Sequence, residues 1–230
     1  VALESIDAAQ RVGDARAELI AHDMVFFAYR SRGDFARSRT HIESALEIAR
    51  RLGARRFEAE IFSFSGQLDF LEGRRADAVK KARTGLAITR EIDTGMRFMG
   101  PTLLGLLMLT TDDATERERA EDEAEALLAR GSVSHNHCYF RRFAIEACLI
   151  AGDYDRAEHH ARTLEDYRAE EGLRLIEFTI ARGLALARAG RGDRDPELAA
   201  EIDHLIAEGE QMHQMIYLSE LRRAREALAA

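Results

Sequence analysis

Apolar side chains recur along this chain at the three- and four-residue spacing of amphipathic helices. Ile42, Ala45, Leu46 and Ala49, for example, fall on one helix face, and charged residues fill the other faces of the same segment. The same spacing recurs in segment after segment. The pattern predicts an all-α chain.

Small turn residues separate the predicted helices at a nearly constant interval. One series marks the turn inside each helix hairpin: Gly33, Gly73, Asp113, Gly152 and Gly192. A second series marks the ends of the returning helices: Gly13, Gly53, the region 93–95, Gly131 and Gly172. Two interleaved series with one period near 40 residues indicate a repeated helix hairpin, and such hairpins bury their apolar faces by stacking into a solenoid.

The turns divide the chain into five predicted hairpins and two terminal helices. The hairpins span about 14–52, 54–92, 96–130, 135–171 and 173–209. A helix at 2–12 precedes them, and a capping helix at about 213–229 ends the chain. Because no Pro- or Ser-rich linker interrupts the period, we expect 1–230 to be a single domain. Since the helix at 2–12 has no partner and no initiator methionine precedes it, we expect the C-terminal part of a longer protein.

Glycines before the hairpin turns set two further expectations. Gly66, Gly105 and Gly183 lie seven residues before Gly73, Asp112 and Gly190, which stand at or next to the turns, and a small residue there would let the second helix of the hairpin approach closely. The third repeat also carries Gly100 and Pro101. Its first helix either begins near Gly100, with Pro101 in the first turn, or runs through Pro101 with a kink. We treat this segment as a hinge or pocket wall.

Charge and composition exclude several classes of function. The net charge is −8 and the pI is near 5.6, so no basic surface for nucleic acid or an anionic membrane is expected. No apolar run approaches the length of about 18 residues that spans a bilayer. Cys138 and Cys148 are ten residues apart on one predicted helix, too far to pair, so we expect reduced thiols in the cytoplasm.

Residues with catalytic or metal-binding chemistry do not form a recognisable site. His135, His137 and Cys138 are metal ligands by type, but their spacing does not converge on one ion, so we favour capping and packing, with metal as the alternative. The acidic run 112–125 goes round a helix with arginines among it. A phosphate-binding loop, a nucleophile elbow and a dinucleotide fingerprint are all missing from the sequence. We expect neither catalysis nor a cofactor.

Surface positions on the first helix of each hairpin are the remaining candidates. In a repeat of this kind the first helices line the concave side, so counting back from each turn picks out the positions that would meet a partner. Aromatic and charged residues alternate there, as suits a peptide groove, although packing between repeats explains the aromatics equally well. The candidates are Asp23, Phe27, Arg30, Glu60, Phe64, Gln67, Tyr139, Arg142, Glu146 and Glu177, with Phe70 and Phe143 in the same register.

Two resemblances make the expectation more specific. The small residue before the turn is similar to that of tetratricopeptide repeats, which implies a TPR-like α-solenoid, a right-handed superhelix. The strings 95–105, 134–137 and 178–187 resemble the C-terminal region of bacterial class III adenylate/guanylate cyclase-like proteins, where repeats follow a cyclase and an ATPase-like domain. This resemblance covers about 94–192 and carries no catalytic motif. It implies a regulatory or interaction module.

The sequence therefore predicts a non-catalytic helical-repeat domain that regulates an upstream cyclase through protein contacts. The partner would be an upstream domain of the same polypeptide or another chain, with a homodimer left open. Nucleic acid and membrane are not expected as partners. The alternative is a solenoid that senses a small ligand in an ATPase-type transcriptional regulator.

Overall fold

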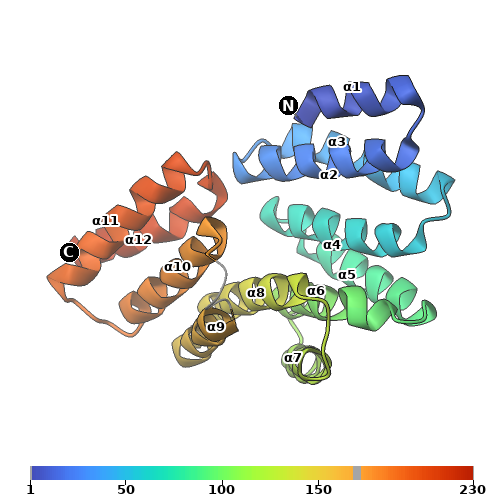
Figure 1. The fold of residues 1–230 in the computed structure, drawn as a ribbon. Coiled ribbons are helices and arrows are strands. Elements are labelled where there is room, and N and C mark those ends of the chain that lie inside the picture. Colours follow the sequence, from blue (N-terminus) through green and yellow to red (C-terminus); the bar gives the residue numbers. More distant parts are fainter. Residues whose placement is uncertain (1, 168–171, 230) are drawn as a thin grey trace.

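The computed structural model describes residues 2–167 and 172–229, and these are helical throughout, with no strand in those two ranges (Figure 1). The first seven helices are α1 (Ala2–Val12), α2 (Ala15–Ser31), α3 (Phe35–Arg51), α4 (Arg55–Leu71), α5 (Arg75–Glu91), α6 (Gly95–Thr110) and α7 (Ala114–Ala129). The others are α8 (His135–Ala151), α9 (Tyr154–Tyr167), α10 (Arg174–Gly190), α11 (Pro196–Gln211), the 3₁₀ turn η1 (Met215–Tyr217) and α12 (Leu218–Ala229). The predicted all-α class is confirmed.

Consecutive helices pack as neighbouring pairs, and the pairs follow one another along an arc (Figure 1). The first helices of the hairpins also contact each other, α4 with α6, α6 with α8 and α8 with α10. They therefore form the inner layer of the arc. The arc curves so far that η1, near the C-terminal end, contacts α2 near the N-terminal end.

The helices begin and end close to the positions that the turn spacing predicts. The differences lie at the C-terminal side: α9 ends at Tyr167, so the last four residues of the predicted fourth hairpin, 168–171, fall outside the described residues. The predicted capping helix at 213–229 begins as η1 and becomes α-helical only at Leu218. None of the helices in the described part of the chain is long and apolar enough to cross a bilayer.

The turn glycines have the left-handed backbone that ends a helix. Gly152, for instance, follows α8 with φ of 73°, and its N–H bonds back to the last turn of that helix. Thr94 adopts the same conformation, with φ of 63°, in the turn at 93–95. The period of the sequence is thus a period of helix ends.

The sequence suggested that each helical glycine lets the second helix of its own hairpin approach. The structure shows that contact at only one of the three. A Cβ at Gly105 would lie 3.2 Å from the Phe140 Cα, so this glycine admits α8, the first helix of the next hairpin, and not its own partner α7. At Gly183 the nearest atoms belong to Ile145 of α8, with Ala161 of α9 farther away. Only Gly66 approaches its own partner α5 as well as α6. These small residues are therefore needed where the first helices of neighbouring hairpins approach one another closely.

Helix α6 runs through Pro101 without stopping, which excludes a start near Gly100. Proline has no N–H for the Arg97 carbonyl, and its ring prevents the next regular bond. The buried amide of Asn136 replaces both interactions: Nδ2 donates to the carbonyls of Arg97 (3.3 Å) and Phe98 (2.8 Å), and Oδ1 accepts from Thr102 N (3.2 Å). Residues 99–110 are buried in the largest apolar cluster, which counts against a hinge.

Candidate functional site

Side chains of α2, α4 and α8 meet on the inner side of the arc as one aromatic ladder. The rings of Phe27 and Phe64 are 4.7 Å apart, edge to face, and Phe64 lies 6.0 Å from Tyr139 of α8. The Arg142 guanidinium carbon lies 4.9 Å from the Tyr139 ring centre. The curvature of the arc therefore brings together residues more than a hundred positions apart.

Two acids, Asp23 of α2 and Glu60 of α4, lie one helical turn before the aromatic ladder on their helices. Burial, and secondarily the charge of Glu60, raises the pKa of Asp23 to about 8. Burial also raises the pKa of Glu60, with Arg56 acting in the opposite direction. At neutral pH Asp23 is therefore mostly protonated, and it supplies little negative charge to the inner face.

Arg30 lies about one turn after Phe27 on α2 and forms a hydrogen bond to α4. Its Nη1 donates to Oε1 of Gln67 at 2.5 Å, and its guanidinium lies over Phe27 at 5.1 Å. Eight of the ten predicted residues thus form one continuous group on the inner face. Phe64 is buried, whereas Phe27 and Tyr139 are half-buried. The ring contacts fit the packing interpretation of the aromatics, and binding of a partner by this group stays a prediction.

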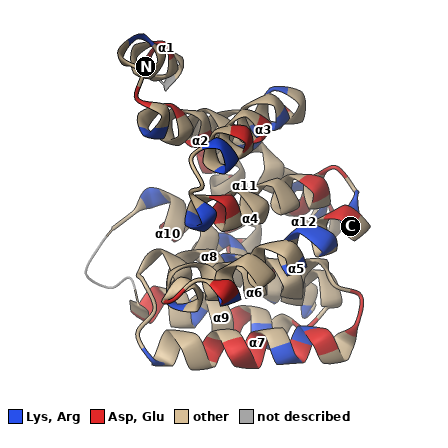
Figure 2. Ribbon diagram, turned by 90° about the vertical axis from the view of Figure 1, so that its right-hand side faces the viewer, with Lys and Arg blue, Asp and Glu red and all other residues tan. Residues whose placement is uncertain are grey.

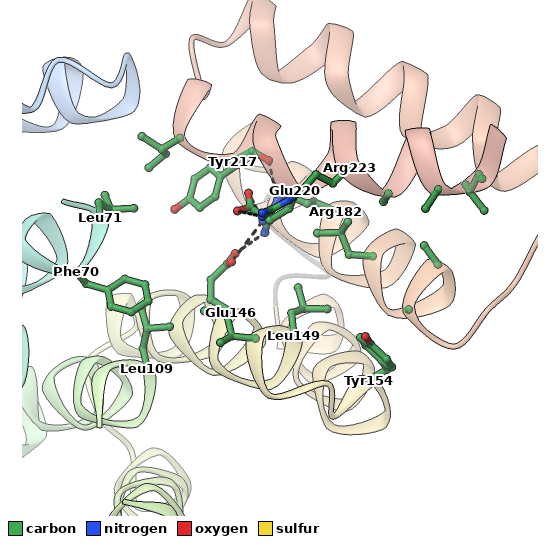
Figure 3. Close-up of a pocket in the computed structure, with 18 of the residues that line it drawn as sticks. Phe70, Leu71, Leu109, Glu146, Leu149, Tyr154, Arg182, Tyr217, Glu220 and Arg223 are labelled. Atoms are coloured by element: carbon green, nitrogen blue, oxygen red, sulfur yellow. Dashed lines mark hydrogen bonds and ion pairs between the residues drawn. The ribbon is translucent and has the colours of Figure 1, made fainter. Parts of the chain in front are cut away.

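Beside this group lies a cavity of about 450 Å³, bounded by α4, α6, α8, α10, η1 and α12 (Figure 3). Gln67, Phe70 and Glu146 line it, as the register of the first helices leads one to expect. Its other walls are mostly aliphatic, with Leu71, Leu109, Leu149, Leu186, Ile216 and Leu228. Cavities of this size and character hold small molecules in proteins.

One buried arginine holds the C-terminal wall of the cavity in place. Arg182 of α10 pairs with Glu146 of α8, lies 3.5 Å from Glu220 of α12, and donates from Nε to the Tyr217 carbonyl at 3.2 Å (Figure 3). Burial acts to lower the pKa of Arg182, but Glu146 and Glu220 outweigh it and the pKa is raised. Arg223 also pairs with Glu220, at 3.1 Å, so two arginines face two glutamates and the network is a structural brace.

The remaining positions in the predicted register lie elsewhere. Glu177 is half-buried in the first turn of α10, with its carboxylate near Gly172. Phe143 is 1% exposed and packs beneath Gly105, so it belongs to the core and not to the concave surface.

The candidate metal ligands have structural partners. The His135 ring bonds to the Phe98 carbonyl at 2.9 Å, and the His137 ring stacks on Tyr167 at 3.9 Å. Across residues 2–167 and 172–229 no cluster of three or more His, Cys, Asp or Glu side chains could hold an ion. Cys138 and Cys148 do not form a disulfide. The favoured packing role of this motif agrees with these contacts.

The acidic run on α7 is an ion-paired outer face (Figure 2). Glu116 pairs with Arg83 at 2.8 Å and Glu123 with Arg90 at 3.0 Å, both on α5. The first of these pairs lowers the pKa of Glu116. A carboxylate with a depressed pKa at the surface makes a poor general acid, as the interspersed arginines lead one to expect.

Sequence reasoning missed Arg182 and Tyr217. A signal for Arg182 existed, because it is the only charge in the otherwise apolar stretch 178–187, and such a charge must be buried and paired. Nothing local marks Tyr217, whose place depends on the C-terminal end returning to α2.

No protein-family model matches the chain, and a search of curated proteins finds no significant match. The site is therefore described by its own geometry.

Proposed function

We propose that this chain is a non-catalytic regulatory domain that senses a small molecule in the cavity of its inner face. The observation that carries the proposal is the cavity itself. It lies on the inner side of the arc, so a molecule bound there contacts α4, α6, α8, α10 and α12 together.

Occupancy of such a cavity would change the curvature of the arc. A ligand that binds the closed arc more tightly than an open one shifts the protein towards closure, by as much as the difference in affinity allows. The outer helices would then present an altered surface to a neighbouring protein. This is the mode expected of the small-ligand sensor that the sequence left as its alternative.

Finer features belong to the same proposal. We place the fold, as one domain, among right-handed TPR-like superhelices on the strength of the stacked helix pairs and the 40-residue period, and the two free cysteines favour a cytoplasmic location. The resemblance to cyclase-like proteins suggests that the regulated neighbour is a nucleotide cyclase. No cofactor, nucleic acid or membrane is part of this function.

A neutral apolar probe tests whether the cavity binds ligands. We expect 1-octanol to bind the intact chain in isothermal titration calorimetry. Ala189→Phe, which fills the cavity from α10, should abolish that binding, whereas Ala200→Phe on the exposed side of α11 should leave it unchanged. The absence of octanol binding, or its persistence in Ala189→Phe, would contradict the proposal.

A role in protein interaction is the second candidate, and one surface favours it. Ile20 and Met24, one turn apart on α2, are 44% and 51% exposed. Paired apolar side chains at a helix surface fit a protein contact. If a second copy of this chain uses them, light scattering should show a dimer that Met24→Glu dissociates. A monomer at all concentrations would remove the homodimer.

A further inference from the structure

Arg30 and Arg142 are the unusual charges of this protein. They are 2% and 7% exposed, and neither forms an ion pair with any carboxylate in the described ranges. Arg30 bonds only to the neutral amide of Gln67. The Nε of Arg30, and the Nε and Nη2 of Arg142, have no hydrogen-bond partner.

The other buried arginines show that this is not the rule of the fold. Arg182 has Glu146 and Glu220, and Arg141, the immediate neighbour of Arg142, holds Glu125 through both terminal nitrogens. Burying a guanidinium without a counter-charge is costly, and proteins ordinarily pair such groups. Two unpaired guanidinium groups in one place indicate a site for an anion.

The two arginines share one cluster of aromatic rings, and the charge of Arg142 acts on Arg30. Each stacks on the aromatic ladder of Phe27, Phe64 and Tyr139. The pKa of Arg30 is lowered to about 10, first by burial and next by the charge of Arg142, while Tyr217 and Tyr139 act to raise it.

Nearby acids do not neutralise this pair. Asp23 has a pKa of about 8 and is mostly protonated at neutral pH. Glu146, one turn after Arg142 on α8, is held by Arg182. Glu60, beside Asp23, has Arg56 as the cation that acts on it. Among the described residues, no carboxylate is therefore left to balance the charge of the pair.

The pair adjoins the cavity. Gln67, which holds Arg30, lines the cavity wall, and so do Tyr217, which acts on Arg30, and Glu146, on the same face of α8 as Arg142. The Tyr217 hydroxyl is a further buried group without a hydrogen-bond partner. A polar, cationic end and an apolar body thus lie side by side.

We infer that Arg30 and Arg142 bind the anionic head group of a small amphipathic molecule whose apolar part fills the cavity. This rests on the proposed ligand-sensing function and names its ligand class: an organic carboxylate or phosphate monoester. The Nε and Nη2 of Arg142 form the edge of a guanidinium that binds two oxygens of such a group at once. Arg30 and the Tyr217 hydroxyl provide the remaining donors.

Calorimetry with three probes of equal chain length tests the inference on the intact chain. We expect octanoate or octyl phosphate to bind at least tenfold more tightly than 1-octanol, and the better of the two identifies the head group. Arg142→Met should remove this advantage but leave octanol binding intact. Arg194→Met, which removes an exposed cation at the same cavity, is the matched control and should keep the advantage.

Each result decides between the claims. Octanol binding without any gain for the anions overturns the anion site but leaves the cavity as a ligand site. If the anions still bind more tightly than 1-octanol to Arg142→Met, or no longer do so to Arg194→Met, the head group lies elsewhere. Either result also overturns the anion site. If none of the three probes binds, both the sensing function and the anion site are wrong. If the Arg142 charge is buried without a counter-charge, ligand-free Arg142→Met should melt at a higher temperature than the unchanged protein. A lower melting temperature would contradict this.

Discussion

Asn136 is expected to stabilise the protein mainly because Pro101 removes regular backbone bonds from α6. Truncation by Asn136→Ala removes four hydrogen bonds and leaves the buried N–H of Thr102 without its partner. The carbonyls of Arg97 and Phe98 keep Val133 N and His135 as donors. Three of the lost bonds cost about 1 kcal/mol each and the fourth, which orphans a buried donor, costs about 1–3 kcal/mol, so the expected loss is roughly 4–6 kcal/mol.

Restoring the N–H at position 101 should reduce that loss. In Pro101→Ala the Thr102 N–H can return to the Phe98 carbonyl and the new N–H can bond to Arg97, as in any helix. In this background we expect Asn136→Ala to cost only about 1–2 kcal/mol. The coupling between the two sites should therefore be at least about 2 kcal/mol, well above the scatter of about 0.5 kcal/mol for independent sites.

Urea unfolding followed by circular dichroism measures all four variants of this double-mutant cycle. Pro196→Ala is the control, because the other proline lies at the start of α11 and should show no coupling to Asn136. Additive effects of Pro101→Ala and Asn136→Ala would refute the idea that the amide replaces the missing helix bonds.

Three further substitutions test individual parts of the structure. Thr94→Gly should stabilise the protein by about 1 kcal/mol, since an exposed threonine at φ of 63° is strained; a lower melting temperature would contradict this. Gly105→Ala should lower the urea midpoint, because overpacking against the Phe140 backbone, about 1–3 kcal/mol, exceeds the gain of about 1 kcal/mol in helix propensity; a rise would argue against the close approach. Asp23 has a folded pKa of about 8, above its unfolded value, so its contribution is complete below pH 4 and declines up to pH 8, by at most about 1.4 kcal/mol per pH unit. Asp23→Asn should remove this decline when unfolding is measured at pH 5 and pH 8, and an unchanged slope would be the contrary result.

The helices could be predicted because their ends are encoded locally. A glycine such as Gly33 or Gly152 fixes a left-handed turn by itself, and the apolar spacing fixes which face is buried. Counting back from these turns picks out Gln67 and Glu146 among the candidates for the concave face, and both line the cavity.

Features that depend on several hairpins at once could not be predicted. The contact of η1 with α2 results from curvature summed over the whole arc, and with it the position of Tyr217. The repair of α6 by Asn136 needs the register between two helices 35 residues apart. The meeting of Arg30 and Arg142 has the same origin, so the sequence named both residues as candidates without showing that they form a pair.

The most direct measurement is a crystal structure of the protein with octanoate bound. The account predicts the carboxylate on Nε and Nη2 of Arg142 and beside Arg30, with the alkyl chain in the cavity against Leu109 and Leu149. A carboxylate bound to Arg182 or Arg194, or octanoate found only outside the cavity, would contradict it.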